Sequence, residues 1–195
     1  MARALGPARL FRSAEALLER EAPNTVVLLH GLRFAPNAGA SLRAAHLLGA
    51  QAVIFIGGVA EKADQDLAPL QEALRISMAA RHGWRLHLCA HPKAEAQKVI
   101  DACRAFGCSN VCVETDTAGL SSPPAALDSA DLAREKAAFL FGAEDTGVPL
   151  ELMKACDDFV SIPTLGKGSL NVSHAVALVL YERGRQIRQK NIQPA

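Results

Sequence analysis

The amino-acid sequence predicts an α/β fold in which a mostly parallel sheet is flanked by helices. Short apolar segments rich in β-branched residues alternate with longer segments of helical spacing. This alternation is typical of parallel strands joined by crossover helices. A chain of 195 residues, half of them hydrophobic and 21% charged, is long enough to enclose one substantial core. We therefore expect one α/β domain with a short extension.

The expected strands are short apolar runs that end at glycine, proline or a polar residue. They cover residues 25–32, 52–58, 85–90, 110–115, 137–142 and 159–163. The expected helices cover residues 37–50, 64–83, 93–107, 149–157 and 170–190, with Gly83 and Gly107 as helix stops. Residues 1–24 are typical of an amphipathic helical extension, which leaves residues 25–195 as the main domain. In parallel sheets of this kind, ligands bind at the carboxyl ends of the strands.

Composition excludes several classes of protein. No apolar run reaches the roughly 20 residues that a membrane-spanning helix needs. The Arg-rich start lacks a continuous apolar segment of the signal-peptide type, so we expect a cytoplasmic protein. Five cysteines without a Cys-x-x-Cys pair argue against a disulfide framework or a cysteine-rich zinc site, and we expect buried thiols.

The basic residues gather at the two ends of the chain, although the net charge is only +1. The first fifty residues hold six arginines, and Arg183, Arg185, Arg188 and Lys190 follow near the other end. These cations fit contacts with phosphates. They also fit the solvated faces of terminal helices, and composition alone favours this second interpretation.

Three segments that follow expected strands carry more small and polar residues than a turn requires. In residues 36–43, Asn37 fits a helix cap, and Arg43 lies on the next turns of the same helix. An arginine there fits either a phosphate or carboxylate ligand or a surface ion pair. In residues 139–149, Gly142 and Gly147 flank Glu144. Helix capping explains the acidic residue there but not the pair of glycines.

The third segment, residues 161–173, places Ser169, Asn171 and Ser173 where a strongly apolar helix begins. One helix needs only one cap, so the additional polar groups indicate a ligand site as the alternative. The segment is not a P-loop, because the spacing G-x-x-x-x-G-K-[ST] is absent, and no G-x-G-x-x-G follows the first expected strand.

Together the three segments resemble the three motifs of the SPOUT methyltransferases, in the SpoU (TrmH-like) branch. NAGASLR (37–43) is similar to the first motif, FGAEDTG (141–147) to the second and IPTLGKGSLNVSHA (162–175) to the third. Each motif alone is weak, but their order and spacing over residues 25–183 make the resemblance specific. The loop of the third motif is one residue shorter than in the common pattern. The residues before Asn37, RFAP, differ from the Asn-Pro-Gly type of turn that commonly precedes the first motif.

The resemblance implies a sheet whose C-terminal part forms a deep trefoil knot, an exception to the general rule that chains are unknotted. It implies that S-adenosylmethionine binds in the knot, at loops around Thr115, Gly142, Ile162, Ser169 and Leu170. It also implies a homodimer, in which the first-motif arginine of one subunit serves the cofactor site of the other. No metal is implied.

The implied reaction is methyl transfer to a ribose 2'-hydroxyl of tRNA or rRNA. The hydroxyl must lose its proton as the methyl group arrives. Arg43 is expected either to assist that loss or to hold the neighbouring phosphate, and both roles stay open because free guanidinium is a very weak base. Asn37, Glu144, Ser169 and Asn171 are expected to position the reacting groups.

Two other functions remain as alternatives. One is a noncatalytic RNA-binding or assembly protein that keeps the same fold and pocket. The other is an unrelated doubly wound enzyme that binds a nucleotide or coenzyme at its strand ends. The five polar residues of the motifs argue against the first, and the missing glycine-rich fingerprints argue against the second.

Overall fold

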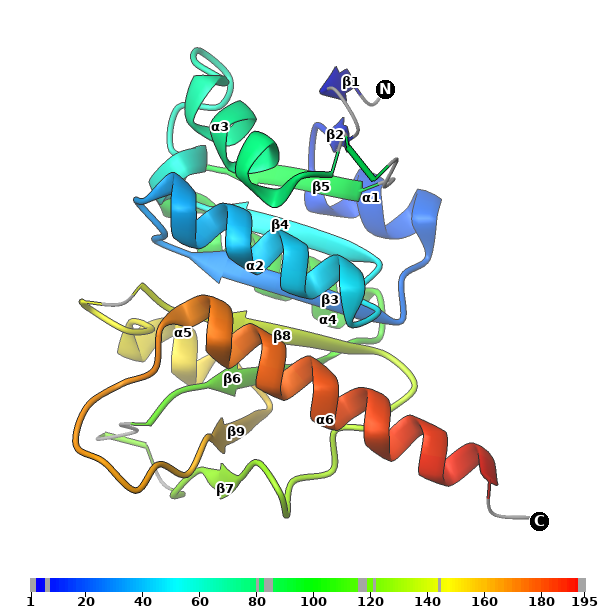
Figure 1. Ribbon diagram of the computed structural model, residues 1–195, viewed down its shortest axis with the longest axis vertical. Coiled ribbons are helices and arrows are strands. Elements are labelled where there is room, and N and C mark those ends of the chain that lie inside the picture. Colours follow the sequence, from blue (N-terminus) through cyan, green and yellow to red (C-terminus); the bar gives the residue numbers. More distant parts are fainter. Residues whose placement is uncertain are drawn as a thin grey trace.

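The computed structural model describes residues 3–5, 8–79, 81–82, 86–115, 119–120, 122–143 and 145–192. Within them the chain forms one sheet with the strand order β1-β2-β5-β4-β3-β8-β6-β9-β7 (Figure 1). The strands are β1 (Arg3–Leu5), β2 (Ala8–Phe11), β3 (Thr25–His30), β4 (Ala52–Ile56), β5 (Leu86–His91), β6 (Ser109–Val113), β7 (Ala125–Ala126), β8 (Ala137–Phe141) and β9 (Asp158–Ser161). The pairing of β1 with β2 is antiparallel, and the other strand pairings are parallel. The predicted mostly parallel α/β sheet is therefore confirmed.

Helices cover both faces of the sheet (Figure 1). They are α1 (Ala14–Glu21), α2 (Ala35–Leu47), α3 (Ala68–Ser77), α4 (Ala96–Ala105), α5 (Leu150–Lys154) and α6 (Val172–Ile192), with short 3-10 turns η1 (Gly58–Ala60) and η2 (Lys93–Glu95). Helices α2, α3 and α6 lie on one face, and α1, α4 and α5 lie on the other. The side chains of a strand point alternately to the two faces, so the central strands fill both cores.

The central strand β3 shows why these segments form strands. All six of its residues are buried. Val27 and Leu29 belong to the core under α2, α3 and α6, whereas Val26 and Leu28 belong to the core under α1, α4 and α5. A strand buried on both faces needs a continuous apolar run, which is the pattern that the sequence shows.

The first part of the chain differs from the expected helical extension. Among its described residues only Ala14–Glu21 is helical, and Ala8–Phe11 instead pairs in parallel with β5. Phe11 is buried there, so docking on the edge of the sheet overrides any local helical preference. Ser13 caps α1, because its hydroxyl accepts a hydrogen bond from the backbone N–H of Ala16 at 3.3 Å.

Helix α3 is shorter than predicted. It begins after Asp66, whose carboxylate accepts a hydrogen bond from the backbone N–H of Ala68 at 2.9 Å. It ends at Ser77, and the next residue, Met78, adopts a left-handed conformation with φ of 62°. The predicted stop at Gly83 lies outside the described residues.

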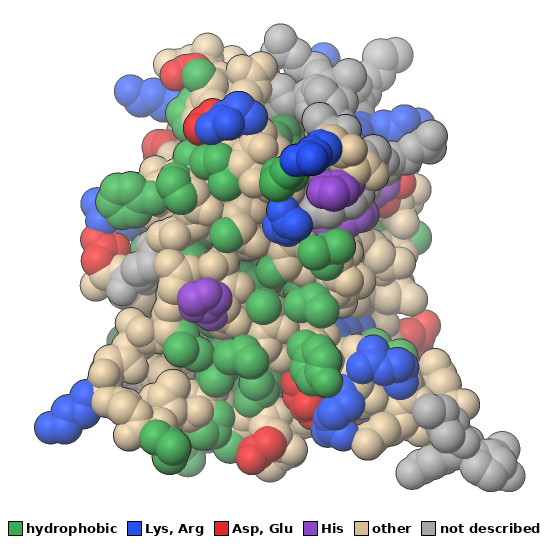
Figure 2. Space-filling model, in the orientation of Figure 1, with side chains coloured by type: hydrophobic (Ala, Val, Ile, Leu, Met, Phe, Trp, Pro, Cys, Tyr) green, Lys and Arg blue, Asp and Glu red, His purple; other side chains and the backbone are tan. Residues whose placement is uncertain are grey.

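One face of the molecule is rich in hydrophobic side chains. Figure 2 shows them gathered over α2 and α6. On α6, Val176, Val179 and Leu180 are buried in the core, whereas Leu178 and Tyr181 are exposed. The helix thus has apolar residues on both its inner and its outer side. In the described part of the chain, no helix is long and apolar enough to cross a bilayer.

Candidate functional site

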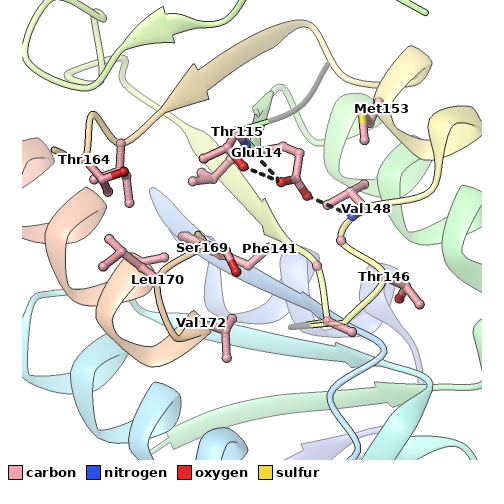
Figure 3. A pocket seen from close by; sticks show the side chains of 16 residues that line it. Glu114, Thr115, Phe141, Thr146, Val148, Met153, Thr164, Ser169, Leu170 and Val172 are labelled. Carbon is pink, nitrogen blue, oxygen red and sulfur yellow. Dashed lines mark hydrogen bonds between the residues drawn. The ribbon is translucent and has the colours of Figure 1, made fainter. Parts of the chain in front are cut away.

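A cavity of about 350 Å³ opens at the carboxyl ends of β6, β8 and β9 (Figure 3). This is the edge of a parallel sheet where ligands usually bind. The lining residues come from the ends of β6 and β8, from the loops after β6, β8 and β9, from α5 and from the start of α6: Val113, Glu114, Thr115, Phe141, Gly142, Ala143, Thr146, Gly147, Val148, Met153, Ile162, Thr164, Ser169, Leu170, Val172 and Ala175. Most of the wall is apolar, and a few polar groups converge on it. That composition is typical of small-molecule sites.

The structure brings all five predicted cofactor residues to this cavity. Thr115 follows β6, Gly142 follows β8 and Ile162 follows β9. Ser169 and Leu170 reach it from the loop before α6. These residues are far apart in the sequence, and the parallel arrangement of β6, β8 and β9 places them around one space.

Glu114 is a pocket residue that the sequence analysis missed. Its carboxylate accepts hydrogen bonds from the backbone N–H of Thr115 at 2.9 Å and of Val148 at 3.0 Å (Figure 3). The side chain thus ties the end of β6 to the loop between β8 and α5. An acidic residue directly after a buried strand was the available signal, but its partner Val148 lies 34 residues away along the chain.

Close packing explains why glycine occupies two positions of the β8–α5 loop. A Cβ atom on Gly142 would lie 2.2 Å from the backbone carbon of Gly147. A Cβ atom on Gly147 would lie 2.6 Å from a carboxylate oxygen of Glu114, and Gly147 has a φ of +61°. Both positions therefore require glycine, which lets the loop fold tightly against Glu114.

Asn171 caps α6. Its side-chain oxygen accepts hydrogen bonds from the backbone N–H of Ser173 at 2.9 Å and from the Ser173 hydroxyl at 2.7 Å. Its amide nitrogen donates to the side-chain oxygen of Asn37 at 3.1 Å. The cap and the link to α2 therefore come from one side chain. Ser169, by contrast, is exposed and lines the cavity.

The other predicted catalytic residues are placed differently. Arg43 lies on the exposed side of α2, where a guanidinium nitrogen is 3.2 Å from the sulfur of Met78. Arg43 is not among the residues that line the cavity. Glu144 lies outside the described residues.

A second contact ties the start of α2 to the pocket loops. Arg33, which precedes α2, forms an ion pair with Asp145 in the β8–α5 loop. Both side chains are largely exposed. The loop after β3 is thus joined to the β8–α5 loop by Arg33, and the first turn of α2 is joined to the residue before α6 by Asn37.

His30 is a buried titratable group at the carboxyl end of β3. It is 2% exposed, and neither ring nitrogen has a hydrogen-bond partner within the described part of the chain. Burial lowers the pKa of His30 below its ordinary value of 6.5, and the nearby charge of Lys93 adds to the effect. Burial therefore favours the neutral form of the His30 ring. Its register neighbour in β4 is Ile56.

Several cations near the C-terminal end have structural partners. Arg183 is buried and donates to the Thr25 hydroxyl at 2.9 Å, to the Asn24 carbonyl at 3.0 Å and to the Leu132 carbonyl. Burial lowers its pKa. Arg185 pairs with Glu182, and Lys190 pairs with Asp131. Buried Arg183 fits neither of the two interpretations of this basic segment, because its donors serve the fold. The more exposed Arg185 and Lys190 form ion pairs, as expected of solvated helix faces.

The cysteines and the acidic residues add no further site. All five cysteines are free and buried, as expected. Burial raises the pKa of Cys89 to about 12 and that of Cys108 to about 11. Across the described ranges, no group of three or more His, Cys, Asp or Glu side chains is placed to hold a metal ion.

A mostly parallel sheet with a mostly apolar cavity at the ends of three adjacent strands is typical of α/β proteins that have a small-molecule site. The chain belongs to the SpoU rRNA Methylase family, whose family model matches residues 24–181. That match contains all three motifs and every residue that lines the cavity. The resemblance noted in the motifs is therefore confirmed.

Similar proteins include two curated methyltransferases. A tRNA (guanosine(18)-2'-O)-methyltransferase of Thermus thermophilus is 32% identical over 181 residues, which cover 90% of this chain and 81% of the relative. A 23S rRNA (guanosine-2'-O-)-methyltransferase of Nitrosomonas europaea is 30% identical over 193 residues, which cover 93% of this chain and 64% of the relative.

Among solved structures, the SpoU methyltransferase AviRb from Streptomyces viridochromogenes in complex with AdoMet aligns with a TM-score of 0.62 at 28% identity. The alignment covers 83% of this chain and 57% of AviRb. The chain thus spans less than two thirds of the length of AviRb and of the rRNA relative.

Proposed function

We propose that this protein is a methyltransferase that transfers the methyl group of S-adenosylmethionine to a ribose 2'-hydroxyl of tRNA or rRNA. The observation that carries the proposal is the cavity at the ends of β6, β8 and β9, which is lined by all five residues expected to bind the cofactor. Membership of the SpoU rRNA Methylase family and the 2'-O-methyltransferase names of the relatives support the same reaction.

The residues present fit S-adenosylmethionine. A cavity of about 350 Å³ is within the usual size range of small-molecule sites. Apolar side chains such as Ile162 and Leu170 offer surfaces for an adenine ring, while Thr115 and Ser169 offer polar groups. The β8–α5 loop comes close to Glu114 because Gly142 and Gly147 carry no side chain. AviRb, which is 28% identical, was crystallised with the same cofactor.

In the proposed reaction, the bond between the methyl carbon and sulfur breaks as the bond to the 2'-oxygen forms. The proton of the hydroxyl must leave in the same step or before it. Arg43 is proposed to assist this loss or to hold the adjacent phosphate. Asn37, Glu144, Ser169 and Asn171 are proposed to position the ribose and the methyl donor, since correct orientation can supply several kcal/mol of the barrier reduction.

The proposed active form is a homodimer. Leu178 and Tyr181 of α6 are exposed. Figure 2 shows hydrophobic side chains gathered over α2 and α6. Because Arg43 does not line the cavity of its own subunit, Arg43 of the partner subunit is proposed to complete each site. A shared site of this kind makes dimerisation a requirement for activity.

The proposed chain path is a trefoil knot within the SPOUT domain, residues 25–195, to which residues 1–24 form an extension. The connection from β6 to β8 carries β7, and β9 pairs between β6 and β7. The backbone N–H of Leu127 also donates to the carbonyl of Ser161 at 2.8 Å. This arrangement supports passage of β9 and α6 through the β6–β8 connection. We further propose that the protein acts in the cytoplasm, where its RNA substrates would lie.

The test is a methyl-transfer assay that compares the wild-type protein with the variant Arg43→Ala. The purified protein and Arg43→Ala are incubated with radiolabelled S-adenosylmethionine and total tRNA or rRNA, and the RNA is digested to nucleosides. We expect label in a 2'-O-methyl nucleoside with the wild-type protein, and its loss with Arg43→Ala despite unchanged cofactor binding.

Two other outcomes would point elsewhere. Cofactor binding without label in any RNA would favour the noncatalytic RNA-binding or assembly protein. Absence of cofactor binding would overturn the proposal.

A further inference from the structure

Phe34 is an exposed aromatic side chain immediately before α2. It is 61% exposed, whereas the other six phenylalanines of the chain are buried or half-buried. Exposure of a large apolar ring forgoes the stabilisation that burial would give. A single exposed apolar residue is common on protein surfaces, so its position has to decide whether it has a function.

The residues on either side of Phe34 are tied to the loops of the cavity. Arg33 pairs with Asp145, which lies between the lining residues Ala143 and Thr146. Asn37, one helical turn later, accepts a hydrogen bond from Asn171. Asn171 lies between the lining residues Leu170 and Val172. These two contacts place Phe34 next to the loops that line the cavity, and the Asn37–Asn171 bond keeps α2 attached there when the ion pair opens.

A phosphate could take the place of the Asp145 carboxylate in the ion pair with Arg33. The side chains of Arg33 and Asp145 are 61% and 52% exposed. Exposed pairs contribute about 0–1 kcal/mol, so an incoming phosphate can replace the carboxylate at low cost. The guanidinium is planar and can bind phosphate oxygens through two hydrogen bonds.

We propose that Phe34 is a stacking platform for an unpaired base of the RNA, and that Arg33 holds a neighbouring phosphate after release from Asp145. The inference rests on the proposed RNA methyltransferase function and assigns a substrate feature to it. Sequence-specific RNA recognition mostly uses unstacked bases that pack on aromatic rings. At the rim of the cavity, Phe34 offers an aromatic ring for a base and Arg33 offers a cation for the adjacent phosphate. The substrate nucleotide would therefore lie in a loop or bulge rather than in a continuous helix.

The test of Phe34 uses an RNA hairpin whose single-stranded loop carries 2-aminopurine in place of one adenine. Anisotropy of a terminal dye gives the affinity, and the 2-aminopurine fluorescence reports stacking. We expect Phe34→Ala and Phe34→Leu to weaken binding roughly five- to a hundredfold and to abolish the fluorescence change. Phe34→Tyr should stay close to wild type. Leu47→Ala, at the other end of α2 and equally exposed at 60%, is the matched control and should have no effect.

The test of Arg33 compares two variants that break the same ion pair. Arg33→Ala should weaken hairpin binding and lower its dependence on salt by about one phosphate contact. Asp145→Asn should strengthen binding, because it frees Arg33. If the pair only supports the loop, both variants will weaken binding alike, and the role of Arg33 is then overturned.

Other outcomes separate this inference from the proposed function. Wild-type affinity in Phe34→Leu, a changed oligomeric mass of Phe34→Ala, or no binding of the hairpin by the wild-type protein would each overturn the stacking role. Methyl transfer to tRNA or rRNA measured in the same preparations decides the proposed function. Transfer that is undiminished in Phe34→Ala would overturn only the stacking role. Binding through Phe34 without methyl transfer by the wild-type protein would overturn only the proposed reaction.

Discussion

The side-chain amides of Asn37 and Asn171, which lie 134 residues apart in the sequence, are joined by a 3.1 Å hydrogen bond. The bond connects the first turn of α2 to the residue that caps α6. It therefore joins the first motif to the third, next to the lining residues Leu170 and Val172. A polar contact between two helix starts holds this side of the cavity in place.

Substitution of Asn171 should separate its two tasks. Asn171→Ala removes the cap, worth about 1 kcal/mol, and the bond to Asn37, worth about as much. We expect the free energy of unfolding in urea to fall by about 2 kcal/mol. Asn171→Ser keeps an oxygen that can accept from the backbone N–H of Ser173 but has no amide to reach Asn37, so it should lose only about 1 kcal/mol. Equal losses in the two variants would contradict the dual role.

Glu114 should matter for the shape of the cavity. In Glu114→Gln only one side-chain oxygen remains, so it cannot accept from both Thr115 and Val148. Hydrogen bonds to charged groups contribute about 1.5–3 kcal/mol, and we expect S-adenosylmethionine to bind about tenfold more weakly in calorimetric titration. Glu151→Gln, exposed on the first turn of α5, is the matched control. A similar loss in both variants would rule out a specific role of Glu114.

Sequence patterns were sufficient to predict the main strands, because each central strand is buried on both faces and shows a continuous apolar run. Strand β2 was not predicted. Its four residues, Ala8–Phe11, lie in an Arg-rich stretch of helical character, and only the free edge of β5 makes them a strand. Short edge segments are decided by tertiary pairing, which local propensity does not contain.

The candidate site was partly predictable for a similar reason. The glycines and small polar residues after the strands marked the loops, and a parallel sheet brings such loops together. The roles of Glu114 and Arg183 were not predictable from local sequence. Their partners are backbone groups such as the N–H of Val148 and the carbonyl of Leu132, which no sequence pattern identifies.

His30 should make stability depend on pH. Burial lowers its pKa in the folded state, whereas in the unfolded chain it titrates near its ordinary value of 6.5. As pH falls from about 7, the unfolded state takes up a proton that the folded state does not, so stability is lost on the acid side, by up to about 1.4 kcal/mol per pH unit.

The test of His30 is a series of urea unfolding curves between pH 8 and pH 5, in the range about its ordinary pKa. His30→Leu removes the titrating group and the two unpartnered nitrogens, so its stability should fall less over this range than that of the wild-type protein. His82→Leu, at an exposed position, serves as the control. A slope that His30→Leu leaves unchanged would assign the pH dependence to other groups.

Arg183 should be far more important for stability than its neighbour Arg185. Arg183→Met leaves the Thr25 hydroxyl and the carbonyls of Asn24 and Leu132 without their charged donor in a buried place. We expect a loss of about 3 kcal/mol in the free energy of unfolding. Arg185→Met breaks only a partly exposed pair with Glu182 and should cost less than about 0.5 kcal/mol. Comparable losses would contradict the anchoring role.

Mixing two inactive variants should reveal whether Arg43 acts across a dimer. Arg43→Ala lacks the proposed catalytic arginine, and Leu170→Arg places a bulky cation at the cavity wall, where it opposes the cationic cofactor. If each site uses its own cavity and Arg43 of the partner subunit, a mixed dimer has one intact site and one doubly defective site. After co-refolding at equal amounts, methyl transfer should recover to about a quarter of wild type, because about half of the dimers are mixed. If both residues served the same subunit, every site would carry one defect, and the mixture would stay as inactive as its components.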